Sequence, residues 1–114
     1  LVRTNPALKN QRWSLISLET AHSSILPDVI SRAPELAPVY LKPNETLKLH
    51  IFIDKSIIEI FVNDKQVVTT RVYPGKKESV GISLKSQGRD ATLISMDVWQ
   101  MKSIYKELQN DFIK

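Results

Sequence analysis

The sequence of 114 residues contains no cysteine and only two histidines. Without cysteine there are no disulfide bonds and no thiol nucleophile, and the sequence offers no basis for a structural zinc site. His22 and His50 lie far apart in the sequence and have no local partner motif. We therefore expect two surface or half-buried histidines rather than a nucleophile–base pair. The sequence predicts neither a metal site nor a cofactor.

Long apolar runs are missing as well. No segment approaches the roughly 20 apolar residues that span a bilayer, and no signal peptide begins the chain. We therefore expect no membrane partner. Because the chain opens at Leu1-Val2-Arg3 without an initiating methionine, we interpret it as an excised piece or a mature fragment.

The chain also lacks a basic stripe, although its formal net charge is +4. Nucleic-acid binding is typically accompanied by clustered cations interleaved with aromatic residues. Here lysines and arginines are scattered among twelve acidic residues, and the only adjacent basic pair, Lys76-Lys77, is followed at once by Glu78. We therefore predict no nucleic-acid partner.

What the sequence does contain is a series of strand patterns. An apolar fraction of 42% in 114 residues is typical of one globular domain. Alternation with period two predicts a strand over 47–54, and β-branched and aromatic residues predict a second over 57–62. A tight turn at Asn63-Asp64 leads into a third strand. This third strand is predicted over 65–73. Further strands are predicted over 79–84, 91–101 and 12–19.

The ends of the chain follow other patterns. Proline lacks a donor for the strand ladder, so Pro27, Pro34, Pro38 and Pro43 predict a long surface crossing with at most short edge pieces such as 39–41. Segment 103–114 has near-helical apolar spacing and is interpreted as a short helix or a frayed tail. Short strands joined by polar turns predict an antiparallel sandwich or barrel.

Two carboxylates are candidate catalysts, because glycoside hydrolysis requires a pair that flanks the sugar. Asp54 and Glu59 would face opposite sides of one flat strand, but the turn at 54–56 leaves their proximity open. We interpret Asp54 as a turn former. We expect Glu59 to pair with a neighbouring base such as Arg71 or Lys55, because an unpaired buried carboxylate is costly.

Aromatic rings are a second signal, because a flat ring can stack on the apolar face of a sugar. Trp99 interrupts the inward alternation of its predicted strand, so we expect it to face a second sheet, a partner domain or a ligand. Protein packing is favoured over sugar. Tyr73 is another candidate contact. Asn44-Glu45-Thr46 has the form of an N-glycosylation sequon, which matters only in a secreted eukaryotic protein.

The segment 49–63, LHIFIDKSIIEIFVN, resembles a signature in the C-terminal β-sandwich of family 32 glycoside hydrolases, the invertase, levanase and inulinase group. The resemblance covers roughly residues 18–105, and its combined pattern is specific. The residues that match, which we expect to be structural, are Asp54, Ser56, Glu59, Phe61 and Asn63, followed by Arg71 and Pro74 of the next strand.

The resemblance implies a parent with two modules, in which a five-bladed β-propeller hydrolyses fructose-containing sugars such as sucrose, levan or inulin with retention. The family's catalytic motifs are of the Asn-Asp-Pro, Arg-Asp-Pro and Glu-Cys types. None is present, because Asn63-Asp64 is followed by Lys65, Arg89-Asp90 is followed by Ala91, and cysteine is absent. We therefore assign no catalytic residue. The resemblance also favours a secreted or periplasmic location.

Together these observations predict an all-β protein: an antiparallel β-sandwich of the lectin-like jelly-roll type. Residues 1–114 would form a single C-terminal domain that is a fragment of a larger glycosidase and is not itself an enzyme. Its partner would be the propeller of the same parent chain, reached through Trp99 and part of the proline-rich crossing.

Two alternative functions stay open, a fructan-binding module and a free-standing enzyme, and the enzyme would require paired carboxylates at the separations that glycosidases use. A fructan-binding module would require two or more exposed, coplanar aromatic rings on a concave surface. The family's sandwich also requires more N-terminal sequence than residues 1–46 supply. Loss of its first strands would leave an unpaired sheet edge and so favour a homo-oligomer.

Overall fold

The computed structural model describes residues 2–4 and 13–105 of the chain. Regular structure in these ranges consists of strands alone: β1 (Val2–Thr4), β2 (Trp13–Leu18), β3 (Glu35–Tyr40), β4 (Leu49–Asp54), β5 (Ile57–Val62) and β6 (Gln66–Arg71). The described residues include no helix long and apolar enough to cross a membrane. The chain divides into two compact units, residues 1–81 and 82–114, and all six strands belong to the first.

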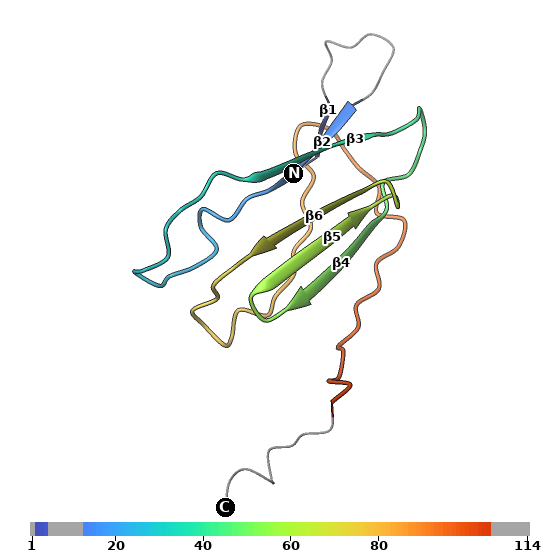
Figure 1. Cartoon of the computed structure of the whole chain (residues 1–114). Coiled ribbons are helices and arrows are strands. Elements are labelled where there is room, and N and C mark those ends of the chain that lie inside the picture. The colour runs from blue at the N-terminus through green and yellow to red at the C-terminus, as the bar shows by residue number, and fades with distance from the viewer. Residues whose placement is uncertain (1, 5–12, 106–114) are drawn as a thin grey trace, which may run out of the picture. The chain divides into compact units, whose positions relative to one another are not determined.

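The strands of the first unit form two antiparallel sheets (Figure 1). One has the order β1-β2-β3 and the other the order β4-β5-β6. Their facing sides bury one small apolar core, and removing this surface from water is the main stabilising term of such a fold. The core residues are Ile16, Ala37 and Val39 of the first sheet and Ile60, Val62 and Val68 of the second. The predicted β-sandwich is confirmed, whereas the jelly-roll connectivity stays a prediction.

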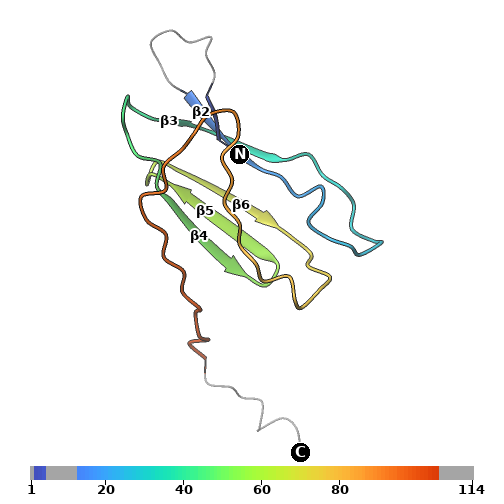
Figure 2. The ribbon, with the colours of Figure 1, turned by 180° about the vertical axis from the view of Figure 1, so that it is seen from behind.

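The sheet β4-β5-β6 is the predicted meander (Figure 2). Lys55 and Ser56 connect β4 to β5, with Lys55 at a positive φ of 51°. Between β5 and β6, the amide of Lys65 donates to the carbonyl of Val62 at 2.9 Å. Asn63 and Asp64 of that turn have φ values of 50° and 54°, as a type I′ turn requires. Both predicted turns are confirmed.

The register divides this sheet into an inner face and an outer face. Ile60 on β5 lies opposite Ile51 on β4 and Val68 on β6. Because opposite residues share a face and Ile60 is buried, these positions face the core. Glu59 lies opposite Phe52 and Thr69 and therefore belongs to the outer face.

The proline-rich crossing contains more strand than the sequence predicts. A short piece over 39–41 was expected, yet β3 pairs with β2 over its whole length from Glu35 to Tyr40. Pro38 is tolerated because β3 is an edge strand. The Pro38 carbonyl accepts a hydrogen bond from the side chain of Gln66 at 3.1 Å, so this residue directs its backbone away from β2, where no ladder donor is needed.

Two predicted strands are absent. Segments 79–84 and 91–101 alternate correctly, but no regular strand follows Arg71 in the described residues. Alternating side chains such as Ile82 and Ile94 are 60% and 73% exposed. A strand is stable only when a neighbour satisfies its backbone, and alternation does not supply that neighbour. The segment predicted as a short helix or a frayed tail falls mostly at 106–114, outside the described residues, and 103–105 are not helical.

Candidate functional site

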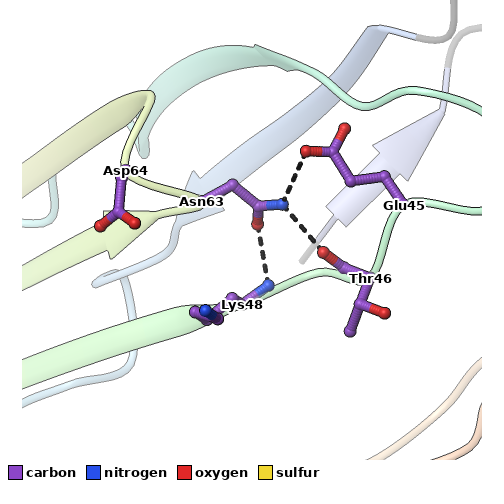
Figure 3. Close-up of a pocket in the computed structure, with 5 residues that line it drawn as sticks. All are labelled: Glu45, Thr46, Lys48, Asn63 and Asp64. Carbon is purple, nitrogen blue, oxygen red and sulfur yellow. Dashed lines mark hydrogen bonds between the residues drawn. The ribbon is translucent and has the colours of Figure 1, made fainter.

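A shallow polar hollow of about 310 Å³ lies beside the turn between β5 and β6 (Figure 3). Its walls come from the loop that precedes β4 and from the turn itself. The lining residues are Glu45, Thr46, Lys48, Asn63 and Asp64. One of them, Asn63, is among the predicted signature residues, so its contacts in the hollow indicate what this signature residue does.

The Asn63 carboxamide holds the loop against the turn. Its Oδ1 accepts a hydrogen bond from the Lys48 amide at 2.8 Å. Its Nδ2 donates to the Thr46 carbonyl at 2.8 Å and to Glu45 Oε1 at 3.4 Å (Figure 3). Asn63 has a positive φ of 50°, a conformation that asparagine tolerates better than most residues. The side chain of this signature asparagine therefore hydrogen-bonds backbone groups of the loop, as a neighbouring strand would.

Glu45 completes this arrangement from the other side. The Lys65 ammonium donates to its Oε1 at 2.7 Å and to its Oε2 at 3.0 Å. The Lys42 amide donates to Oε2 at 2.6 Å, and Lys65 also donates to the Tyr40 carbonyl at 3.2 Å. The hydrogen bond from Lys65, followed by that from the Lys42 amide, lowers the pKa of Glu45 to about 2. We call Glu45, Asn63 and Lys65 the latch.

The latch is suited to holding the loop before β4 against the turn between β5 and β6, rather than to catalysis. A glycosidase needs one carboxyl group that is protonated near neutral pH as an acid. Glu45 has the opposite property, because its lowered pKa keeps it ionised. Both Asn63 polar atoms are occupied by the chain itself. Within the described ranges, no group of three or more histidine, aspartate or glutamate residues could hold a metal ion.

The other signature residues of β4 and β5 lie outside the hollow. Asp54 ends β4, and Ser56 follows in the turn, where its carbonyl accepts a hydrogen bond from the Val72 amide at 2.8 Å. This bond extends the pairing of β5 with β6 beyond the strand ends. Phe61 lies on the outer face, with its ring edge-on to Phe52 at a centroid distance of 5.8 Å.

Glu59 has a different partner from the one expected. An ion pair with Arg71 or Lys55 was predicted, but Glu59 Oε1 accepts a hydrogen bond from the Thr69 hydroxyl at 3.3 Å. Among the described residues, the recorded ion pair is Glu45–Lys65. Glu59 is only half-buried, so water can solvate its charge and no cation is required.

Asp54 and Glu59, the candidate catalytic carboxylates, lie on the same face of the sheet but do not line a common cavity. Phe52 lies opposite Glu59 and Asp54 lies opposite Ile57, so Asp54 and Glu59 both project from the outer face. The hairpin turn thus cancels the opposite orientation expected for a single strand. Neither residue lines the polar hollow, and Asp54 is exposed.

The predicted contact residues are open to solvent. Arg71 lies over the ring of Tyr73, with its guanidinium carbon 5.7 Å from the ring centroid, and Tyr73 is 37% exposed. Pro74 follows and is also exposed. Trp99, in the second unit, is 73% exposed. His22 and His50 are exposed as well.

Sequence reasoning missed the two charged members of the latch. In the sequence, Glu45 stands out only as the middle of a glycosylation sequon. Lys65 stands out only as the start of a strand and as the residue that follows Asn63-Asp64 in place of a motif proline. Glu45 and Lys65 are 20 positions apart, so no local spacing connects them. A weak signal was present in Asn44, because asparagine favours turns; in the structure its φ is 62°, and the Glu45 amide donates to the Lys42 carbonyl at 3.0 Å.

The latch and the meander lie within the region that known proteins share. The family model described as "Glycosyl hydrolases family 32 C terminal" matches residues 10–100. The chain belongs to this family. The resemblance seen in segment 49–63 is thereby confirmed, and the latch and the β4-β5-β6 meander are features of a family 32 C-terminal domain.

Individual relatives of this family 32 domain are enzymes by name. Raffinose invertase of Escherichia coli is 38% identical over 64 residues, which are 55% of this chain and 13% of that protein. Levanase of Bacillus subtilis (strain 168) is 37% identical over 73 residues, 62% of this chain and 10% of that protein. Acid beta-fructofuranosidase 2, vacuolar, of a Rosa hybrid cultivar is 33% identical over 91 residues, 76% of this chain and 14% of that protein.

The family 32 domain therefore spans between 10% and 14% of the length of these three relatives. No solved structure gives a significant match to it.

Proposed function

We propose that this chain is a non-catalytic accessory domain that packs against and stabilises the catalytic β-propeller of its own parent chain. The parent would be a retaining glycoside hydrolase that acts on fructose-containing sugars such as sucrose, levan or inulin. The family supports a hydrolase parent, since relatives are named levanase and invertase and this domain spans a small share of each. The observation that carries the accessory role is an uncovered apolar face.

The outer face of the β4-β5-β6 sheet is unusually apolar for a surface in water. Its large side chains Phe52, Ile57, Phe61 and Val67 are 45%, 44%, 37% and 46% exposed. Three of them, Phe52, Phe61 and Val67, are contiguous, because Phe61 lies opposite Val67 and its ring touches that of Phe52. Contiguous apolar patches on soluble proteins mark interaction surfaces. In a protein mostly made of a preceding catalytic region, that region is the nearest available partner.

This surface replaces part of the one expected from the sequence. Trp99 is exposed, as a docking residue must be, but it belongs to the second unit. The proline-rich crossing contributes Ile25 and Ile30, which are 66% and 83% exposed. The outer face is the better supported surface, because its residues are held in register by two strand ladders and so form a rigid platform.

The ring geometry disfavours the alternative of a fructan-binding module. Sugar stacking on a platform needs rings whose planes are aligned. Phe52 and Phe61 instead meet at 87°, and His50 and Phe52 at 61°. Edge-on rings are a stable arrangement for packing among themselves or against a protein. This favours a protein partner for the outer face.

The direct test uses the intact parent protein. Phe61→Asp places a charge in the middle of the outer face, where docking would bury it without a partner. We expect a lower thermal midpoint for the catalytic module and faster limited proteolysis between the modules. Leu36→Asp is the matched control, since Leu36 is 56% exposed on the other sheet. Equal effects of the two substitutions would count against docking through the outer face.

Two assays on the isolated chain test the remaining parts. Hydrolysis of sucrose or levan by the chain alone should remain at background, and turnover that survives repurification would contradict the non-catalytic assignment. Titration with levan or inulin should give neither heat nor a tryptophan spectral shift. Saturable binding would support the fructan-binding alternative instead.

A further inference from the structure

The edge of β4 that faces away from β5 has no strand neighbour among the described residues, and its apolar side chains are exposed. The Asn63 amide donates to the Lys48 carbonyl at 3.0 Å, so Lys48 directs its backbone toward β5. Backbone groups alternate in direction along a strand. His50, Phe52 and Asp54 therefore also bond β5, whereas Leu49, Ile51 and Ile53 direct their amides and carbonyls away from it.

The same three residues expose their side chains. Leu49, Ile51 and Ile53 lie on the inner face, opposite Val62, Ile60 and Ile58. Yet they are 42%, 51% and 63% exposed, because the core is centred on β5 and β6 rather than on β4. Among the described strands, this edge therefore has no neighbour, and it presents its outer backbone groups together with three aliphatic side chains.

Natural sheets usually protect such an edge with proline, inward-facing charge or a bulge. The edge strand of the other sheet, β3, contains Pro38, and the side chains of Gln66 and Lys65 bond its outer carbonyls. By contrast, β4 pairs with β5 without interruption from 49 to 54 and has no proline. An unprotected edge of this kind is a template for another strand.

The sequence of β4 is complementary to itself when two copies run antiparallel. With Ile51 opposite Ile51 of the second copy, Leu49 lies opposite Ile53. In this register the outward-facing residues form hydrogen-bonded pairs, each of which exchanges both backbone bonds. On the outer face, Lys48 then lies opposite Asp54. Opposite charges in directly opposed positions stabilise a strand pair, whereas like charges destabilise it.

We propose that two copies of this chain associate through β4, antiparallel and centred on Ile51, so that one sheet continues through both. The arrangement is isologous, because each copy contributes the same strand and the two Lys48–Asp54 contacts are equivalent. It leaves the outer face free, so it does not depend on docking to a catalytic module. The partner is a second copy of this chain.

The first experiment follows the mass of the full 114-residue chain by sedimentation equilibrium over a concentration series. The weight-average mass should rise from 13.0 kDa toward twice that value. Ile51→Lys places a charge on the edge and should weaken association by at least about tenfold, equivalent to about 1.4 kcal/mol. Val67→Lys is the matched control, at 46% exposure on the outer face of β6 and opposite Phe61 rather than β4, and should leave association unchanged.

A charge exchange tests the register itself. Lys48→Asp alone opposes two carboxylates across the edge, and Asp54→Lys alone opposes two ammonium groups, so each variant should self-associate more weakly than the parent chain. A mixture of the two variants restores both opposite-charge contacts. We expect the mixture to form heterodimers in preference to either homodimer. Circular dichroism of each variant checks that the sandwich is retained.

The outcomes are distinct. A chain that stays monomeric at every concentration overturns the proposal. A dimer lost on Val67→Lys but not on Ile51→Lys uses the outer face instead, which also overturns it. Failure of the two charge variants to prefer each other rejects the antiparallel register. In the intact parent, Val67→Lys should weaken docking alone, so the two proposals fail separately.

Discussion

The Lys65 ammonium lies 2.7 Å from Glu45 Oε1, and Asn63 Nδ2 lies 3.4 Å from the same oxygen. One carboxylate oxygen thereby joins the loop before β4 to the turn that follows β5. The strands themselves do not require this contact. Its effect is to fix how the polypeptide enters the meander, and several predictions about stability depend on it.

Replacing the latch asparagine should destabilise the domain. Asn63→Ala leaves the Lys48 amide without its partner and places a Cβ-only side chain at a positive φ. Loss of the hydrogen bonds and the added strain together predict a loss of about 2–3 kcal/mol in the free energy of unfolding. Urea unfolding followed by circular dichroism measures it.

Two glycine variants separate the causes. Asn63→Gly removes the same hydrogen bonds without the strain, so it should be less destabilising than Asn63→Ala. Asp64→Gly, at a φ of 54° in the same turn, should be neutral or slightly stabilising. If Asn63→Ala and Asp64→Ala destabilise equally, the carboxamide contacts contribute nothing.

The latch should weaken in acid. The pKa of Glu45 falls from 4.5 to about 2 in the folded protein, chiefly through its hydrogen bond from Lys65. Because the folded pKa is lowered, the stabilisation is complete above about pH 4.5 and is lost as the pH falls toward 2. The difference in urea midpoint between the wild type and Glu45→Gln should therefore shrink over that interval. A difference that stays constant from pH 6 to pH 2 excludes this linkage.

Gly75 should not tolerate a side chain. A Cβ at this position would lie 2.6 Å from Ile25 Cγ1, which is closer than real Cβ contacts. Gly75→Ala should destabilise the domain by about 1 kcal/mol or more through overpacking. Ile25 is 66% exposed, so Ile25→Ala alone should cost little. The double variant should recover most of the loss in a thermal melt; an additive result would show that this contact is absent.

Burial should separate two valines on neighbouring strands. Val62 is 0% exposed and Val67 is 46% exposed. Val62→Ala removes methyl groups from the core and leaves a cavity, so it should cost about 2 kcal/mol. Val67→Ala, the same chemical change on the outer face, should cost less than about 0.5 kcal/mol. Chemical unfolding of the two variants gives the comparison, and equal losses would place the core incorrectly.

Much of the meander could be predicted because its signals are local. Asn63-Asp64 and Lys55-Ser56 specify turns through their own backbone preferences, and the alternation on either side fixes which residues share a face. The strands β4, β5 and β6 therefore lie within the predicted ranges, apart from their exact ends. The missing catalytic motifs were equally readable, since a residue that is absent requires no tertiary information.

The sequence did not predict in the same way which segments pair with one another as neighbouring strands. Segments 79–84 and 91–101 have as good an alternation as β4, but alternation shows only that a segment suits a sheet. β3 was underestimated for the opposite reason, because Pro38 is acceptable in a strand only when the strand lies at an edge, and edge position is a property of the assembled sheet.

The sequence by itself determined the family, the strand-and-turn pattern of residues 49–71 and the absence of the family's catalytic motifs, because each depends on residues that are adjacent or close in the chain. The tertiary structure alone decided that Glu45 meets Lys65, that Glu59 bonds Thr69, and that β4 lies at one edge of the order β4-β5-β6. These outcomes depend on which segments come together in space. Such contacts are selected by the free energy of the whole fold rather than by the preferences of any one segment.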